Sequence, residues 1–205
     1  MANLRIAVLI SGSGSNLQAL MDHCDNGIIP GQVVLVISNR ADAYGLERAR
    51  QKGIATQVIE HRQFSDRRDF DIALQQAIDQ AEVGLVCLAG FMRVLTGDFV
   101  RHFQGRLMNI HPSLLPAFPG LHVQQQAIDA GVRFAGATVH FVDEGVDTGP
   151  IIAQAVVPVL QDDDAQRLAE RILLQEHRIY PLAVQLFAEN RLLVEGRRVS
   201  ILYPS

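Results

Sequence analysis

The sequence predicts an α/β fold in which helices cover both faces of a mostly parallel, twisted sheet, with antiparallel strands toward the carboxyl-terminal part. Two observations lead to this prediction. Continuous apolar runs such as residues 5–10 are typical of strands that are buried on both faces. These runs alternate along the chain with amphipathic stretches of helical periodicity. Regular alternation of this kind indicates a Rossmann-like arrangement.

Length and composition predict a single domain, residues 1–205. A chain of 205 residues with 48% hydrophobic residues can build one sizeable core. The formal net charge of -4, with no clustered basic face, argues against a nucleic-acid or membrane-surface partner. We find no cleavable signal and no apolar run that could cross a bilayer, so we expect a cytoplasmic location. Cys24 and Cys87 lack metal-ligand spacing and are interpreted as buried thiols in a reducing compartment.

Four strands and four helices are predicted in the first half of the chain. The strands are expected at residues 5–10, 33–37, 55–59 and 85–88. The first helix follows the glycine-rich turn 11–16 and should end at Gly27, and the second should stop near Gly53. The third should start at Asp66, and Thr96 is a candidate cap for the fourth.

The second half is predicted to contain three strands, two helices and a terminal hairpin. The strands are expected at residues 107–111, 137–142 and 151–157. A short helix is expected at residues 123–130. The longest helix should begin at the acidic triplet 162–164, whose charge favours the helix dipole, and run to about Asn190 with a kink or break at Pro181. Residues 192–202 should form the hairpin.

Asn109 and His111 are the first candidates for chemistry. They stand two apart on a predicted strand, so their side chains should leave the same face and enter one pocket. Pro112 disfavours continuation of the strand, which places His111 at its carboxyl end, where open α/β sheets bind ligands. The alternative is structural: His111 would cap a turn and Asn109 would satisfy backbone groups.

The glycine-rich turn is a candidate phosphate site. Residues 12–17 begin like a dinucleotide fingerprint, but Leu17 stands where the third glycine belongs. Small residues between a strand and a helix expose backbone N–H groups at a positive helix end, which is a place for one phosphate. The alternative is a tight turn capped by Ser15 or Asn16.

Asp147 is the third candidate, in the loop 143–150 after a predicted strand. If this loop closes over His111, the carboxylate would raise the pKa of the imidazole and make it a usable acid near neutral pH. The alternative is an ordinary turn residue.

Other readings of the polar residues are weaker. His122 and His140 do not have the spacing of metal ligands, so no metal is predicted. Ser11, Ser13 and Ser113 lack the Gly-x-Ser-x-Gly context of a serine nucleophile.

Four strings of residues, taken in order and spacing, resemble the phosphoribosylglycinamide formyltransferase family of purine synthesis. They are ISGSGSNL at 10–17, LAGFMR at 88–93, NIHPSLLP at 109–116 and the aspartate loop that ends in Gly149-Pro150. The resemblance covers nearly the whole chain. The third string is specific to formyl-group folate enzymes as a superfamily, and the short length and the opening loop select this family. The resemblance implies the formyltransferase fold and 10-formyltetrahydrofolate as cosubstrate.

The resemblance also implies binding roles. The phosphate of glycinamide ribonucleotide would lie on Gly14, Ser15 and Asn16. The ribose would lie near Leu173, Leu174, Gln175 and Glu176. Formyl folate would lie against Met92, Arg93, Val94, Leu95, Asn109, Asp143, Glu144, Gly145, Val146 and Asp147, with its glutamate tail at Arg67. Without the resemblance, Arg67 and Glu176 would be interpreted as exposed helix residues, and Met92 and Leu95 as core contacts.

Four positions depart from the family pattern. Ser13 replaces a common asparagine, Val123-Gln124 replaces a common Thr-His, and Thr148 replaces a glycine. These departures concern substrate contacts and loop flexibility and leave the chemical residues in place.

The implied reaction is a direct formyl transfer to the amine of glycinamide ribonucleotide. Asn109 and protonated His111 would donate to the oxyanion, His111 would protonate the departing folate nitrogen, and Asp147 would orient His111. We expect small-molecule substrates and a monomer or homodimer.

Three alternatives stay open. Methionyl-tRNA formyltransferase shares the Ser-Leu-Leu-Pro region, but it normally carries a further carboxy-terminal domain and should have a basic surface. Formyltetrahydrofolate hydrolase passes the formyl group to water with the same trio of residues, but usually has a regulatory amino-terminal domain. A non-catalytic nucleotide-binding module would need only the glycine-rich turn.

Overall fold

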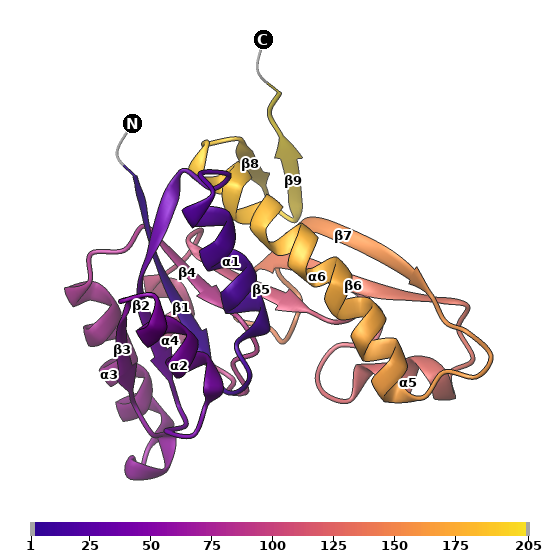
Figure 1. Ribbon diagram of the computed structural model, residues 1–205, viewed down its shortest axis with the longest axis horizontal. Helices are drawn as coiled ribbons and strands as arrows, with labels where there is room; N and C mark the ends of the chain where they lie inside the picture. The colour runs from indigo at the N-terminus through magenta and orange to yellow at the C-terminus, as the bar shows by residue number, and fades with distance from the viewer. Residues whose placement is uncertain (1–2, 204–205) are drawn as a thin grey trace. The chain divides into compact units, whose positions relative to one another are not determined.

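The computed structural model describes residues 3–203 and has the predicted fold class, a mostly parallel mixed sheet of seven strands with helices (Figure 1). The chain divides into two compact units, Met1–Asn109 and Ile110–Ser205. The division falls within strand β5 (Leu107–His111). The single-domain prediction stays a prediction, and the expected lack of a signal at Met1 concerns a residue outside the described range.

The first unit contains the parallel part of the sheet. Its other strands are β1 (Leu4–Ile10), β2 (Gly31–Ser38), β3 (Ala55–Val58) and β4 (Leu85–Leu88). Its helices are α1 (Ser15–Asp25), α2 (Tyr44–Gln51), α3 (Arg67–Gln80), α4 (Gly97–His102) and the short 3-10 helix η1 (His61–Gln63), which was not predicted.

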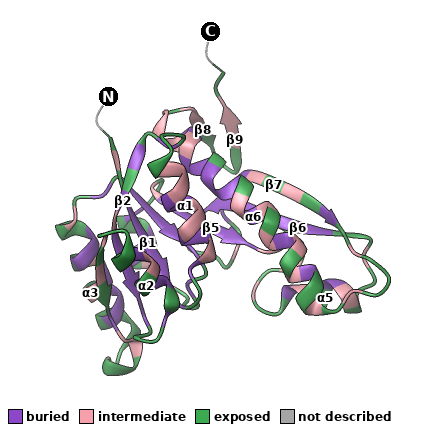
Figure 2. Cartoon of the chain, viewed as in Figure 1, coloured by how far each residue is buried: buried purple, intermediate pink, exposed green. Residues whose placement is uncertain are grey.

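Parallel pairing explains the continuous apolar runs. β1 pairs with β2 and β4, β2 with β3, and β4 with β5, all in parallel. Every side chain from Ile6 to Ile10 is fully buried, so β1 is covered on both faces. Figure 2 shows the same pattern, with buried residues along the strands and exposed residues on the outer sides of α2 and α3. The carboxyl ends of these strands therefore meet at one edge of the sheet.

The predicted cap at Thr96 is confirmed, and Asp66, which was predicted only as the start of α3, also caps its helix. The alternative cap at Ser15 or Asn16 is corrected. Asp66 accepts a hydrogen bond from the backbone N–H of Arg68 (2.7 Å) and Thr96 accepts one from that of Phe99 (3.4 Å). The residue before α1 is Gly14, in the left-handed region at φ 70°, so neither Ser15 nor Asn16 caps this helix.

The second unit contains the antiparallel elements. These are α5 (Val123–Asp129), β6 (Phe134–Phe141), β7 (Ile151–Pro158), α6 (Ala165–Ala188), β8 (Leu192–Glu195) and β9 (Arg198–Ile201). β6 pairs antiparallel with β7, and the predicted hairpin is confirmed as the separate β8–β9 pair. All residues of β6 after Phe134 are buried, so this strand is covered on both faces.

The acidic triplet holds the start of α6. The Asp164 side chain accepts a hydrogen bond from the backbone N–H of Arg167 (2.8 Å). Arg171 donates two hydrogen bonds to Asp163 (2.6 and 2.8 Å), and these lower the pKa of Asp163 to about 2. The helix therefore begins directly after the triplet, as predicted, and Asp164 caps it.

Of the kink or break predicted at Pro181, the break is wrong, because α6 continues from Ala165 to Ala188 with Pro181 inside it; the kink stays a prediction. Proline removes one backbone hydrogen bond and normally disfavours helix. Here the flanking Tyr180 and Ala183 are fully buried, and α6 packs on β6 and β7. Burial of this apolar face offsets the lost hydrogen bond.

Within residues 3–203, none of the helices combines the length and the apolar character needed to span a membrane.

Loss of the α6 cap should be measurable. We expect Asp164→Ala to lower the free energy of unfolding by about 1 kcal/mol, because the Arg167 N–H loses its acceptor. The control is Asp162→Ala, since that side chain is 83% exposed and should contribute little. Urea unfolding followed by circular dichroism tests this, and equal stability of the two variants would contradict the capping role.

Candidate functional site

His111 is the last residue of β5 and only 5% exposed. Its Nε2 lies 3.0 Å from the carbonyl oxygen of Phe118. A carbonyl only accepts, so Nε2 carries the proton and donates. The other ring nitrogen, Nδ1, lies 3.5 Å from Oδ2 of Asp147. The imidazole is therefore fixed by the loop that follows it, with one nitrogen directed at a carboxylate.

Asp147 reaches His111, as the sequence suggested. Its side chain is 13% exposed, and Oδ2 also accepts a hydrogen bond from the backbone N–H of Gly120 (2.9 Å). The backbone of Asp147 lies in the left-handed region at φ 54°, which few non-glycine residues adopt. The carboxylate therefore bridges the imidazole and the loop after Pro112 from a constrained position.

A second buried histidine, His140, lies on the other side of Asp147. Its Nε2 lies 3.8 Å from Asp147 Oδ1, and its Nδ1 lies 2.8 Å from the carbonyl oxygen of Phe141, to which it donates. Burial lowers the pKa of His140, against the opposing effects of the Phe141 carbonyl and Asp147. His140 was considered only as a metal ligand from the sequence. Its burial was not visible there, because the strand alternation alone does not show that both faces are covered.

Asn109 lies two positions before His111 on β5 and is half-buried. Residues two apart on a strand leave the same face, as predicted. Asn109 pairs in register with Leu88, the last residue of β4, so it lies at the carboxyl edge of the parallel strands.

The glycine-rich turn forms a close contact with the start of α2. The carbonyl of Gly12 accepts from the N–H of Gly45 (3.0 Å), and Arg48 donates to the carbonyl of Ser13 (2.9 Å). A Cβ at Gly14 would lie 2.5 Å from the Cα of Gly45, so only glycine fits there. Gly14 is the residue before α1, and Ser15 and Asn16 are the first two residues of this helix. The first turn of a helix is a place where backbone N–H groups can bind an anion.

The segment 92–96 is tied at both ends while its side chains face outward. The N–H of Met92 donates to the hydroxyl of Ser11 (2.8 Å), and the N–H of Thr96 donates to the carboxylate of Asp71 (2.6 Å). Met92 and Val94 are 65% and 58% exposed, and Arg93 is also exposed, so the interpretation of Met92 as a core contact is wrong. The segment presents an exposed, partly apolar strip.

Arg67 adds a third tie, because its Nη2 donates to the carbonyl of the half-buried Leu95 (2.9 Å). Arg67 itself is exposed, and a guanidinium has five N–H donors, so most of them stay available.

Sequence reasoning missed the residues that support this strip. Ser11 donates to Asn39 (2.6 Å), and Asn39 donates to Nδ1 of His61 (3.2 Å). Asp71 is 3% exposed, and its Oδ1 has no hydrogen-bond partner. Ser11 and Asn39 directly follow buried strands, and that shared position was the available signal.

The four residues 173–176 of α6 differ in their exposure. Leu174 is 65% exposed, Leu173 and Gln175 are half-buried, and Glu176 is only 7% exposed. The interpretation of Glu176 as a solvated helix residue is therefore wrong. The sequence predicts a helix around Glu176, but it does not show that this helix buries the side chain.

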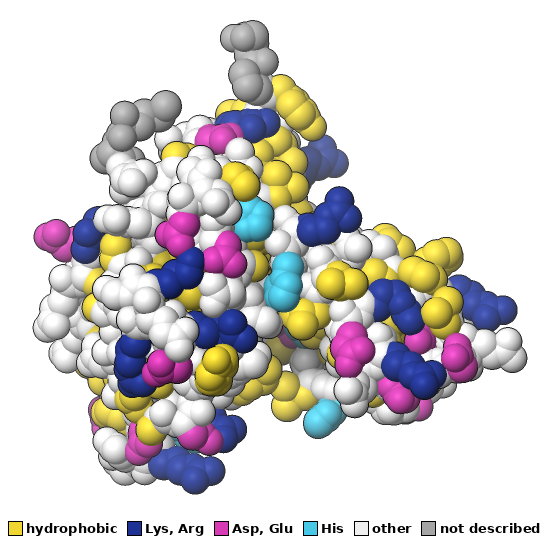
Figure 3. Space-filling view, viewed as in Figure 1, with side chains coloured by type: hydrophobic (Ala, Val, Ile, Leu, Met, Phe, Trp, Pro, Cys, Tyr) yellow, Lys and Arg dark blue, Asp and Glu magenta, His cyan; other side chains and the backbone are white. Residues whose placement is uncertain are grey.

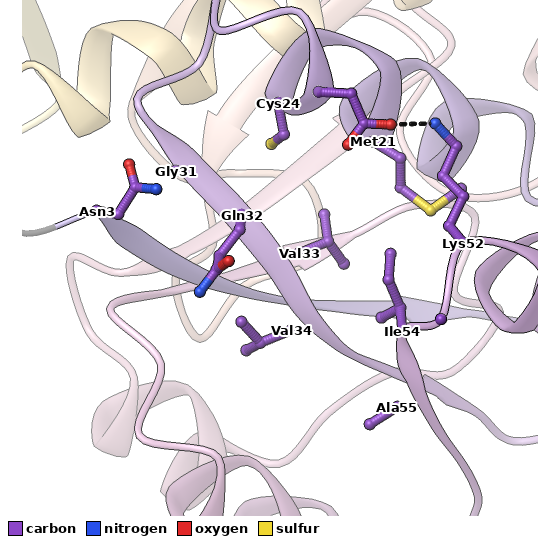
Figure 4. Close-up of a pocket in the computed structure, with 12 residues that line it drawn as sticks. Asn3, Met21, Cys24, Gly31, Gln32, Val33, Val34, Lys52, Ile54 and Ala55 are labelled. Atoms are coloured by element: carbon purple, nitrogen blue, oxygen red, sulfur yellow. Dashed lines mark hydrogen bonds and ion pairs between the residues drawn. The ribbon is translucent and has the colours of Figure 1, made fainter.

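A hollow of about 770 Å³ lies at the amino ends of β2 and β3 (Figure 4). Its Lys52 ammonium is committed to Asp22 (2.8 Å) and to Asp25. Cys24, also in its lining, is half-buried, so the prediction of two buried thiols holds for Cys87 and is wrong for Cys24. Burial raises the pKa of the Cys24 thiol to about 11, so it is a poor nucleophile. This hollow lies at the edge of the sheet opposite to the usual ligand edge.

Among residues 3–203, no group of three or more His, Cys, Asp or Glu side chains is arranged to hold a metal ion.

An α/β protein with a buried His–Asp pair at the carboxyl end of a strand is equipped for acid–base chemistry on a bound ligand. The family model for formyl transferases matches residues 4–184, and the chain belongs to that family.

Individual relatives and a solved structure show which formyl transferases this chain is similar to. The chain is 51% identical to phosphoribosylglycinamide formyltransferase of Escherichia coli (strain K12), over 92% of this chain and 89% of that protein. It is 54% identical to the trifunctional purine biosynthetic protein adenosine-3 of Drosophila melanogaster, over 93% of this chain but only 14% of that longer protein. The crystal structure of glycinamide ribonucleotide transformylase 1 from Symbiobacterium toebii matches with a TM-score of 0.96 and 57% identity, over 98% and 95% of the two chains.

The buried His140 should make stability depend on pH. A pKa lowered by folding means that the unfolded chain binds more protons below the ordinary histidine value of about 6.5. Stability should therefore be fully present above about pH 6.5 and decrease as pH falls toward the folded-state pKa, by at most about 1.4 kcal/mol per pH unit.

His140→Gln removes this titration. We expect urea unfolding at pH 7.5 and 5.5 to show a smaller difference in unfolding free energy for the variant than for the wild type. An identical pH dependence in both proteins would show that His140 does not make this contribution.

Proposed function

We propose that this protein transfers the formyl group of 10-formyltetrahydrofolate to the amine of glycinamide ribonucleotide. The observation that carries the proposal is the buried His111 with its ring nitrogen 3.5 Å from Asp147, in a chain of the formyl transferase family. The Escherichia coli and Symbiobacterium toebii relatives, which match this chain over nearly their whole length, are a phosphoribosylglycinamide formyltransferase and a glycinamide ribonucleotide transformylase.

The reaction begins when the neutral amine attacks the formyl carbon, forming a C–N bond and a tetrahedral oxyanion. The amide of Asn109 donates a hydrogen bond to this oxygen, and the Nε2–H of the protonated His111 ring does so by exchanging the Phe118 carbonyl for the oxyanion, while Nδ1 stays directed at Asp147. The carbon–N10 bond of the folate then breaks, and His111 supplies a proton to the departing nitrogen directly or through water. The attacking nitrogen loses a proton, so formyl glycinamide ribonucleotide and tetrahydrofolate leave as products.

Asp147 keeps His111 ready for this step. A carboxylate 3.5 Å from Nδ1 attracts the positive charge of the imidazolium in a buried setting. The Phe118 carbonyl fixes the ring from the opposite nitrogen. Together these contacts orient the acid.

The binding roles are proposed group by group. The phosphate of glycinamide ribonucleotide binds at Gly14, Ser15 and Asn16, at the first turn of α1. Its ribose binds at the segment that contains Glu176. Formyl folate binds the strip at residues 92–95, Asn109 and the loop 143–147, and the free donors of Arg67 take the glutamate tail.

The charge distribution supports a proposal for the partners, to which we add a proposal for the location. We propose small-molecule substrates, no nucleic-acid or membrane partner, a monomer or homodimer, and a cytoplasmic location. On the face drawn in Figure 3, cationic and anionic side chains are interspersed, and the net charge is -4, which disfavours binding to a phosphate backbone. An amide and an imidazolium supply the charge stabilisation, so the proposed step uses no metal.

The direct test mixes the purified protein with 10-formyl folate and glycinamide ribonucleotide and follows the deformylated folate by absorbance. We expect release that depends on the amine and is lost in His111→Ala. Release without the amine would point to hydrolysis. No release with any acceptor would favour a nucleotide-binding module.

Asn109→Ala should lower kcat on the order of a hundredfold, because one oxyanion donor contributes about 3 kcal/mol. The KM for glycinamide ribonucleotide should change little, since the contact forms with charge that develops in the transition state. Steady-state kinetics measure both. A rise in KM with an unchanged kcat would instead make Asn109 a binding residue.

Asp147→Asn should lower kcat and change its pH profile, because the imidazole loses the carboxylate that lies 3.5 Å from its Nδ1. Asp129→Asn is the matched control, since it removes a carboxylate from exposed α5 that pairs only locally with Gln125. An Asp147→Asn enzyme with full rate and the wild-type profile would refute the role of Asp147.

A further inference from the structure

We propose that Thr148 is a positioning residue: its hydrogen bond to Asp143, the Thr148–Asp143 bridge, holds Asp147 toward His111 before any ligand binds. This inference rests on the proposed function for its catalytic consequence. The bridge itself is a property of the loop 143–148 and is testable without substrates.

Two hydrogen bonds within the loop converge on one carboxylate oxygen of Asp143. The hydroxyl of Thr148 donates to Oδ1 of Asp143 (2.6 Å), and the N–H of Gly145 donates to the same oxygen (3.1 Å). Thr148 at the end of the loop and Gly145 in its middle are thus both hydrogen-bonded to Asp143 at its start. Asp147 lies inside the ring that the bridge closes, directly before Thr148.

Asp147 needs such a tie because its backbone conformation is unfavourable. At φ 54° a residue with a Cβ is strained relative to the helical and extended regions. Its carboxylate is held by the Gly120 N–H at 2.9 Å, and its carboxyl-terminal neighbour is held by the bridge. If the bridge opens, the backbone at Asp147 is free to relax, and the carboxylate moves away from Gly120 and His111.

Gly145 supports the bridge by an independent observation. A Cβ at Gly145 would lie 2.1 Å from the Thr148 hydroxyl oxygen and 3.2 Å from the Thr148 Cβ. The φ of Gly145 is not in the left-handed region, so the glycine is needed for space and not for backbone conformation. The Thr148 side chain therefore occupies the space that a side chain at position 145 would need.

The base of the loop is closed separately. The N–H of Phe141 donates to the carbonyl of Pro150 (2.9 Å), and a Cβ at Gly149 would lie 1.8 Å from the Phe141 carbonyl oxygen. β6 and β7 continue the pairing from there. Opening of the bridge should therefore loosen residues 143–148 and leave the fold intact.

Thr148→Val tests the bridge, because it removes the hydroxyl and keeps the shape, and Thr148→Ser is the matched control that keeps the hydroxyl. The first readout is hydrogen exchange of the Gly120 amide without ligand. We expect faster exchange in Thr148→Val only, by about five- to tenfold, as for the loss of one hydrogen bond. The amide of Leu115, which donates to Thr138 (3.1 Å), should exchange equally in all three proteins.

The second readout is kinetic. We expect Thr148→Val to lower kcat by about five- to tenfold and to change the pH profile in the same way as Asp147→Asn, while Thr148→Ser stays within about twofold of wild type. Unchanged Gly120 exchange in Thr148→Val, or equal effects of Val and Ser, would overturn the bridge. A wild-type protein without formyl transfer would instead refute the proposed function and leave the exchange result standing.

Gly145→Ala should also open the Thr148–Asp143 bridge. It should speed Gly120 exchange as Thr148→Val does, because the added methyl expels the threonine hydroxyl. In a Thr148→Gly background the same change should have little further effect, since the clashing side chain is gone. Additive effects of the two substitutions would contradict a shared bridge.

Discussion

The buried carboxylate of Asp147, held between two imidazole rings, is the constraint on which this part of the molecule depends. Each ring has one nitrogen committed to a backbone carbonyl, His111 through Phe118 and His140 through Phe141. Each ring therefore turns its other nitrogen toward the carboxylate. Burial lowers the pKa of His140 and so disfavours a charge on that ring.

The two carbonyls that fix the rings come from segments with little freedom. Phe118 lies in the left-handed region at φ 53°, in a loop that begins with His111-Pro112, and Phe141 ends the buried strand β6. Backbone acceptors of this kind do not change charge with pH and have no side-chain rotamers. The ring orientations are thus set by the path of the chain, which explains how a loop-rich region can still present a defined acid.

Most of the fold could be predicted because the local signals agree with the tertiary structure. The apolar runs of β1 and β4 are continuous because both faces are covered, and Asp66 and Thr96 cap helices where polar residues precede apolar periodicity. The failure at Pro181 has the opposite cause. Burial of the surrounding face of α6 outweighs a local helix breaker, and burial depends on contacts that periodicity alone does not reveal.

The candidate site was predictable only in part, for a related reason. Asn109, His111 and Asp147 were found from spacing, strand ends and the family resemblance, and the structure brings Asp147 to His111. The supporting roles of Asp71 and Ser11 were not found, because each acts through a partner far away in sequence. The partner of His140 is close in sequence, and His140 was not found because the strand pattern does not show its burial. Supporting contacts of this type leave no short pattern to recognise.

The exposed strip at residues 92–95 has a chemical consequence. Met92 is 65% exposed, on a segment whose backbone is tied by Ser11 and Asp71. Oxidants in solution therefore reach its sulfur, and the sulfoxide is polar where the side chain was apolar. Such damage would alter the exposed surface of the strip while the core stays packed, and enzymatic reduction of the sulfoxide would restore it.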